Sequence, residues 1–189
     1  SLWNDNFGVK RILIDMTLST PTLWQNQDQE TINALLQRAV AADETRPFLD
    51  FLGDIYSIGE IDKKANQLAH GLQSTGIKKG DTVATLLDNS PEAIFIWLAI
   101  NKLGAISVPI NTAYKGEYLR HQLADSDASL VIAESAYLSR VTEIADKLSA
   151  MKALVCRGDY PEKTSIDQKL IGWEALVSDN HSDPGIDVA

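Results

Sequence analysis

The chain of 189 residues has the length of one domain, and its 44% hydrophobic and 23% charged residues are ordinary for a globular protein with a buried core. Its 17 basic and 26 acidic residues give a net charge of −9, which argues against nucleic acid or an anionic membrane surface as a partner. The sequence has no apolar run of transmembrane length and no signal-peptide pattern, and a single cysteine, Cys156, favours a cytoplasmic location.

The N-terminal part of the chain begins with an expected extended arm over residues 1–30, in which only Val9 to Met16 suggests an ordered element. Two apolar runs, 48–52 and 55–58, flank Gly53-Asp54 and predict a β-hairpin that turns there. Between the arm and the hairpin, apolar residues at helical spacing predict an amphipathic helix: Ile32, Leu35, Leu36, Ala39 and Val40.

A second helix is predicted from a capping box. Ser57 and Glu60 have the spacing at which the hydroxyl bonds a first-turn amide and the carboxylate bonds the amide of the cap residue. We expect this helix to end at Gly76. Its predicted buried face consists of Ile61, Ala65, Leu68, Ala69 and Leu72, and its predicted outer face of Asp62, Lys63, Lys64, Asn66 and Gln67.

The central stretch of the chain predicts a strand, a capped helix and a second strand. Residues 82–87 form an apolar run that suits a buried strand. Ser90 then stands at a helix N-cap, Pro91 at the first helical position and Gly104 just past the helix end, before residues 105–110 become extended again. Such a βαβ unit makes its two strands parallel. We expect a core that includes Val83, Leu86, Ile94, Trp97, Leu98, Ile106 and Val108.

The second half of the chain continues to alternate between helix and strand. Helices are predicted over 117–125 and 137–148, strands over 129–133 and 153–156, a loop over 157–168 and a short helix over 170–177. Residues 178–189 are polar and show no pattern of regular structure. This alternation predicts an α/β domain, with a parallel sheet flanked by helices.

Motifs that would identify a reaction are absent from the sequence. It has neither a P-loop nor a dinucleotide-binding glycine pattern, and His70, His121 and His181 lack metal-ligand spacing. Asp88 follows a predicted parallel strand, where a site residue often lies, but it also fits a simple turn into the next helix. Both interpretations of Asp88 stay open.

Three short segments carry a resemblance to a known family. Leu-Asp-Asn-Ser-Pro-Glu at 87–92, Lys-Leu-Gly-Ala at 102–105 and Val-Pro-Ile-Asn at 108–111 resemble the N-terminal part of the AMP-forming acyl-CoA synthetases. The likeness is to the branch with crotonobetaine/carnitine-CoA ligases and medium- or long-chain fatty-acyl-CoA ligases, and it extends from about residue 31 to 189. It implies that residues 31–189 form the N-terminal α/β subdomain of an enzyme that activates a carboxylic acid, of fatty-acid or betaine type. Such an enzyme uses ATP and Mg²⁺ to form an acyl adenylate and then CoA to form a thioester.

The resemblance also bears on what this chain does by itself. In the family, the loop that holds the ATP phosphates follows a segment similar to 183–189, so the chain is expected to stop before that loop. We therefore expect the chain alone to have no catalytic residues, to bind no cofactor, to be inactive and to self-associate. A non-catalytic α/β module that binds a ligand or a partner is the alternative.

The resemblance implies one place for cofactor contact. Relatives often have a basic residue after the Asn111 position, near the CoA nucleotide at the mouth of the pantetheine tunnel, which points to Tyr114 and Lys115. An arginine found two residues after the asparagine in some relatives is Ala113 here. A lysine in contact with solvent alone is the other interpretation of Lys115.

Overall fold

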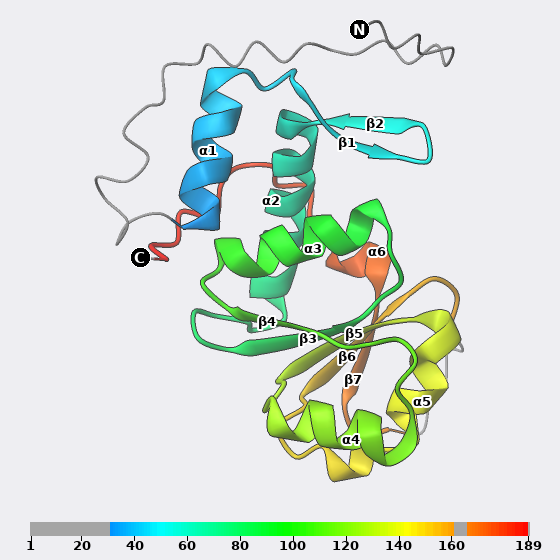
Figure 1. Ribbon diagram of the computed structural model, residues 1–189. Coiled ribbons are helices and arrows are strands. Elements are labelled where there is room, and N and C mark those ends of the chain that lie inside the picture. Colours follow the sequence, from blue (N-terminus) through cyan, green and yellow to red (C-terminus); the bar gives the residue numbers. More distant parts are fainter. Residues whose placement is uncertain (1–30, 161–165, 189) are drawn as a thin grey trace, which may run out of the picture. The chain divides into compact units, whose positions relative to one another are not determined.

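A computed structural model describes residues 31–160 and 166–188 of the chain. Its centre is a five-stranded sheet in the order β4-β3-β5-β6-β7, in which every neighbouring pair is parallel (Figure 1). The strands are β3 (Thr82–Leu86), β4 (Ile106–Pro109), β5 (Leu130–Glu134), β6 (Ala153–Arg157) and β7 (Lys169–Gly172). The predicted parallel α/β sheet is therefore confirmed. The arm predicted over 1–30, including Val9 to Met16, lies outside the described residues.

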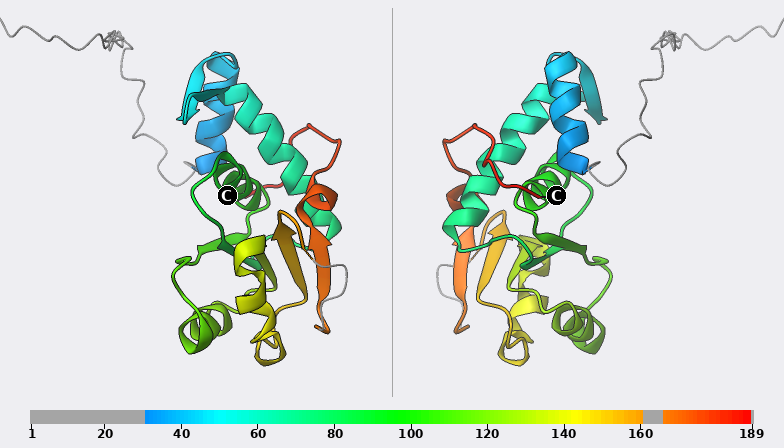
Figure 2. Two further views of the ribbon diagram at one scale, coloured as in Figure 1. Left: turned by 90° about the vertical axis from the view of Figure 1, so that its right-hand side faces the viewer. Right: turned by 90° about the vertical axis from the view of Figure 1, so that its left-hand side faces the viewer.

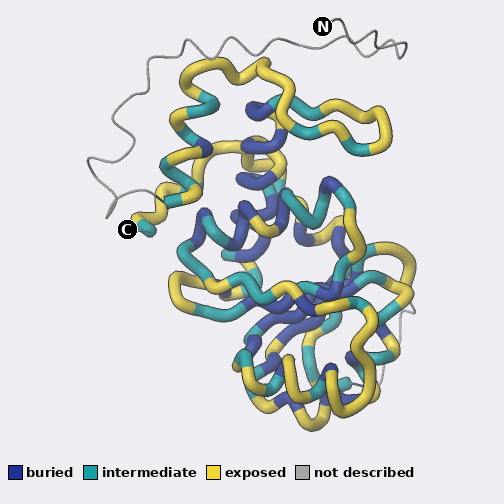
Figure 3. Tube along the Cα trace, viewed as in Figure 1, coloured by how far each residue is buried: buried dark blue, intermediate teal, exposed yellow. Residues whose placement is uncertain are grey.

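Helices cover both faces of this sheet, as Figures 1 and 2 show. One face carries α1 (Ile32–Ala42), α2 (Ile58–Ser74), α3 (Pro91–Lys102) and α6 (Trp173–Leu176), and the other carries α4 (Gly116–Asp125) and α5 (Leu138–Thr142). Successive strand residues face opposite cores: Val83 packs into the first and Ala84 into the second. Burial on both faces explains why the central strands are almost wholly apolar (Figure 3), and Cys156 is among their buried residues.

The predicted helix caps are present. The Ser57 hydroxyl accepts a hydrogen bond from the Glu60 amide at 3.2 Å, and the Glu60 carboxylate accepts one from the Ser57 amide at 2.8 Å. That backbone bond lowers the pKa of Glu60. At α3, the Ser90 hydroxyl accepts from the Ala93 amide, Pro91 is the first helical residue, and Gly104 has a φ of 63° past the helix end. Local chemistry thus sets the boundaries of both helices.

The predicted hairpin forms, but its turn lies one residue earlier than expected. Strands β1 (Pro47–Phe51) and β2 (Asp54–Ser57) are antiparallel, and Phe51 pairs with Asp54. The turn residues are therefore Leu52 and Gly53, with φ values of 55° and 97°. A two-residue hairpin turn favours positive φ at both of its central residues. Glycine adopts such a φ without strain, so Gly53 suits the second central position.

Two helix predictions in the second half of the chain need correction. The helix expected over 137–148 is split into a 3₁₀ turn at Ser135–Tyr137, α5 and a second 3₁₀ turn at Ala145–Lys147. Near the break, the Thr142 hydroxyl donates to the Ser139 carbonyl at 3.0 Å, a local bond that competes with helix continuation. The segment expected as one helix over 170–177 begins as β7, because β6 offers an edge with which it pairs.

The predicted core is correct in its centre and wrong at one side. Val83, Leu86 and Leu98 are buried, whereas Trp97 is 40% exposed and Ile106 is 53% exposed. The reason is the position of β4, which is an edge strand with a neighbour on one side only. The predicted core members Ile94 and Val108 are half-buried.

Candidate functional site at the carboxyl edge of the sheet

The order in which strands are added to the sheet reverses between β3 and β5. The crossover from β3 runs through α3 to β4, whereas that from β5 runs through α5 to β6, on the other side of the β3–β5 pair. The loops that follow β3 and β5 therefore diverge at the carboxyl ends of these strands. In open α/β sheets, ligands bind at such a topological switch point.

Asp88 lies at this switch point and has a specific partner. The Tyr137 hydroxyl, from the segment after β5, donates to the Asp88 carboxylate at 2.8 Å from one oxygen and 3.0 Å from the other. The hydrogen bond to Asp88 raises the pKa of Tyr137, because only the protonated phenol can donate it. Asp88 is thus more than a turn residue: it joins the loops after the two strands.

Arg140 connects this pair to the loop in which the two sequence-predicted site residues lie. Its guanidinium stacks over the Tyr137 ring, 4.5 Å from the centroid, and donates to the carbonyls of Thr112 at 2.7 Å and Tyr114 at 3.4 Å. Lys115 follows in the same loop and is exposed. It precedes α4 as the cap residue, yet its side chain forms no capping bond. Tyr114 and Lys115 therefore lie at the carboxyl edge of the sheet, in a loop that the hydrogen bonds from Arg140 hold in place.

A cluster of one arginine and two glutamates lies at the carboxyl ends of β5 and β6. The Arg157 guanidinium donates to both oxygens of Glu134, at 2.8 and 3.0 Å, and to Glu92 at 2.7 Å. Glu134 and Arg157 are register partners at the ends of β5 and β6, and Glu92 belongs to the first turn of α3. Sequence reasoning missed this cluster because the register of two strands distant in sequence brings it together.

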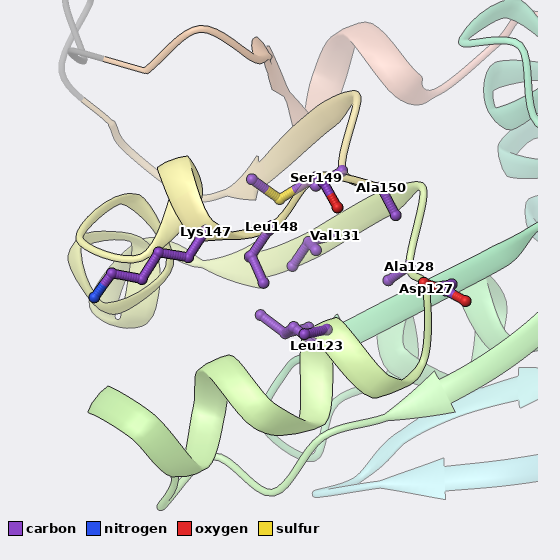
Figure 4. A pocket seen from close by; sticks show the side chains of 10 residues that line it. Leu123, Asp127, Ala128, Val131, Lys147, Leu148, Ser149 and Ala150 are labelled. Atoms are coloured by element: carbon purple, nitrogen blue, oxygen red, sulfur yellow. The ribbon is translucent and has the colours of Figure 1, made fainter.

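A groove of about 260 Å³ extends from Asp88 between α3 and the strands β3 and β4. Asp88 and Asn89 form its polar end, while Ile94, Trp97 and Pro109 contribute apolar wall. The cavity drawn in Figure 4 is different: it measures about 30 Å³ and lies at the amino ends of β5 and β6, between α4 and residues 147–151. A space of that size suits water and nothing larger. The groove at Asp88 is the one adjoining the switch point.

The histidines occupy scattered positions in the described part of the chain. His70 lies 2.9 Å from the Ser182 carbonyl oxygen, and His121 lies 3.2 Å from Asp125. Within residues 31–160 and 166–188, no group of three histidine, cysteine or acidic side chains is placed to hold a metal ion. None of the helices described there has the length and apolarity to cross a membrane.

Sequence reasoning also missed a buried lysine. The Lys102 ammonium lies 2.9 Å from Asp62 and 3.2 Å from Asp183, and its side chain is 1% exposed. Asp62 and Asn66 are buried, which corrects the prediction that they lie on the outer face of α2. The helical pattern placed them outside because it could not show that residues 178–187 return to cover this side of α2.

Comparisons with known proteins agree on one family. Residues 36–184 match the family model described as AMP-binding enzyme. The chain is 37% identical over 101 residues to a crotonobetaine/carnitine–CoA ligase from Salmonella typhimurium, covering 53% of this chain and 20% of that protein. It is 34% identical over 110 residues to the 4-coumarate–CoA ligase CCL1 of Humulus lupulus, covering 58% and 20%.

The solved structures give the same result. A putative long-chain-fatty-acid CoA ligase from Rhodopseudomonas palustris superposes with a TM-score of 0.73 at 26% identity, covering 84% of this chain and 39% of that one. The chain thus spans about a fifth of the length of the curated relatives named above.

Proposed function

The chain belongs to the AMP-binding enzyme family, and from this premise we propose that residues 31–189 are the N-terminal α/β subdomain of an ATP-dependent ligase that forms acyl-CoA thioesters. The carrying observation is the family match over residues 36–184, a range that contains the whole parallel sheet. The names of the relatives, which include CoA ligases for crotonobetaine and coumarate, support the reaction class. The reaction would join a carboxylic acid to AMP and then to CoA. Mg²⁺ and a cytoplasmic location stay predictions.

The residues of this chain suited to a cofactor are those of the loop before α4. An exposed lysine there can meet a phosphate as a point charge, and no side-chain cap bonds the first amides of α4. Arg140 contributes indirectly, since its bonds to the carbonyls of Thr112 and Tyr114 hold the loop in place. We propose that Tyr114 and Lys115 lie at the entrance for CoA, whose bound form supplies the thiol that accepts the acyl group.

The proposed substrate is an aliphatic acid, of fatty-acid or betaine type. The identity of 37% to the crotonobetaine/carnitine–CoA ligase supports this choice, although the relative named for coumarate is 34% identical. A panel of carboxylates assayed for thioester formation by the full-length protein tests it. Benzoates and cinnamates used in preference to aliphatic acids would contradict it.

The isolated chain is proposed to be inactive and to associate with itself. Its span of about a fifth of the relatives supports the first part, and the exposed Ile106 on the edge strand β4 supports the second. A second copy is the proposed occupant of this edge, because edge strands pair readily and two-fold contacts are the commonest in homo-oligomers. Pyrophosphate exchange by the isolated chain with any carboxylate would contradict inactivity.

A charge reversal tests the CoA contact in the full-length protein. Lys115→Glu should raise the KM for CoA by roughly tenfold, in line with the loss of one charge-assisted bond, while adenylation measured by pyrophosphate exchange stays unchanged. The matched control is Lys152→Glu, an exposed lysine at the amino end of β6, on the opposite edge of the sheet. An unchanged KM for CoA in Lys115→Glu would remove this residue from the site.

A further inference from the structure

The buried ammonium of Lys102 joins two carboxylates from distant parts of the chain. Asp62 belongs to α2, and Asp183 belongs to residues 178–187, which run beside α2 without regular structure (Figure 2, red). Removing an ammonium from water is favourable only when charged partners compensate it. A lysine with 1% exposure at the end of a mostly apolar helix is therefore a specific feature.

The two carboxylates have different roles. Asp62 also accepts bonds from Gln37 of α1 at 2.9 Å and from Asn66 at 3.1 Å, so its charge is neutralised and bonded within the helices. Asp183 is 48% exposed and comes from outside the helices. The Lys102–Asp62 pair is thus a fixed site, and Asp183 is the partner that docks onto it.

Gln37 of α1 also donates to the Asp183 carboxylate, at 3.3 Å, whereas the bonds to the segment from α2 go to its main chain. Asn66 donates to the His181 carbonyl at 2.8 Å, Gln67 donates to the Ser178 carbonyl at 2.8 Å, and His70 lies 2.9 Å from the Ser182 carbonyl oxygen. Carbonyl groups recur at every residue, so these bonds would also form if the segment slipped along α2. The ion pair to Asp183 distinguishes one position from its neighbours.

The ion pair also determines where the segment leads. The other oxygen of Asp183 accepts a bond from the Gly185 amide at 2.8 Å, which shapes a turn with a φ of 69° at Gly185. Beyond it, the Asp187 carbonyl accepts from the Lys79 ammonium at 3.0 Å, next to the turn before β3. A shift at Asp183 therefore moves everything that follows.

We propose that Lys102 is a positioning residue: it sets the register of residues 178–187 on α2 and so the point from which the longer relatives continue. The effect of Lys102 on catalysis rests on the proposed function. The register of residues 178–187 on α2 is a property of this chain and does not depend on it. Lys102 acts through the segment and touches no substrate.

Hydrogen exchange measured on the 189-residue chain tests the register. Asp183→Asn keeps the oxygen that bonds Gly185 but removes the charge that meets Lys102, so exchange in peptides covering 178–187 should rise about three- to fivefold. Peptides from α2 and α3 should stay protected, and the control Asp179→Asn, in the same segment, should match wild type. Unchanged exchange in Asp183→Asn would overturn the proposal. Lys102→Met should free the segment further, but it risks unfolding, which leaves Asp183→Asn as the deciding variant.

The full-length protein tests the catalytic consequence. Asp183→Asn should lower kcat/KM for ATP in pyrophosphate exchange by at least about tenfold relative to Asp179→Asn, because misplaced binding groups lose much of their effect. Faster exchange at 178–187 together with full activity would overturn the positioning role. If wild type itself shows no adenylation with any carboxylate, the proposed ligase function fails, and hydrogen exchange alone then decides the register.

Discussion

Two residues of α3 depart from the rule that apolar side chains are buried and charged ones exposed, and they lie in different regions of the molecule. Lys102 is charged and 1% exposed, whereas Trp97 is the largest apolar side chain of the helix and is 40% exposed. Around Lys102, carboxylates from α2 and from residues 178–187 complete the environment. Near Trp97, the strand β4 is the edge of the sheet, and Ile106 is exposed on the opposite face of that strand.

The difference shows that the covering elements decide burial along α3. In the Lys102 region, each charged side chain has a partner from the same chain. The Trp97 region leaves apolar surface at an edge strand, a combination typical of surfaces that contact another chain or another part of a longer one. Stability should therefore respond to changes at Lys102, and association to changes at the edge strand β4.

The largest expected effect is on stability at Lys102. Lys102→Met should lower the free energy of unfolding by about 3 to 5 kcal/mol, because Asp62 would stay buried without its cation. Urea denaturation followed by circular dichroism measures this. The control is Lys63→Met, whose exposed pair with Glu44 should contribute no more than about 1 kcal/mol. Equal losses in the two variants would mean that the buried pair has no special role.

A pair of isoleucines on α3 sharpens the same comparison. Ile96 is 1% exposed, so Ile96→Ala should lower stability by about 2 to 5 kcal/mol. Ile94 is half-buried beside the groove, and Ile94→Ala should lower it by roughly half as much, since less apolar area is lost. Thermal or urea unfolding of both variants provides the measurement. A larger loss at Ile94 would show that the groove side is covered in solution.

Association should depend on the β4 side. Ile106→Lys places a charge on the edge strand, which should weaken self-association of the isolated chain at least about tenfold while changing monomer stability by about 0.5 kcal/mol or less. Sedimentation velocity over a range of concentrations measures it. Leu52→Lys is the control, an exposed leucine at the tip of the hairpin. Dissociation by Leu52→Lys alone would move the interface to the hairpin, and a wild-type chain that is monomeric at every concentration would exclude self-association.

The same contrast explains which features the sequence could predict. Helix caps at Ser57 and Ser90 were predictable because their partners lie within three residues. The strand β7 was mistaken for helix because its pairing with β6 depends on a distant segment. Trp97 was assigned to the core because its apolar character says nothing about whether another element covers it.

The site divides in the same way. The sequence and its family resemblance led to the loop with Tyr114 and Lys115, which the structure places at the carboxyl edge. The Asp88–Tyr137 bond was not predictable, since it requires β3 and β5 to be neighbours, an order that sequence alone does not determine. The Lys102 cluster was missed for a related reason: one of its carboxylates comes from the segment beyond α6.

The smallest expected effect is a pH dependence at Asp183. Burial raises the pKa of this carboxyl, but the Gly185 amide and the Lys102 ammonium outweigh it and hold the pKa below its ordinary value of 3.8. A pKa lowered by folding stabilises the protein above the unfolded value, and this stabilisation is lost as pH falls through the folded value. Because Asp183 is about half exposed, we expect less than about 1 kcal/mol. Urea unfolding should therefore show wild type slightly more stable than Asp183→Asn at pH 6, with the difference shrinking below pH of about 4. A difference that grows as pH falls would mean that protonated Asp183 is the better partner, and the ion pair with Lys102 would then not hold the segment.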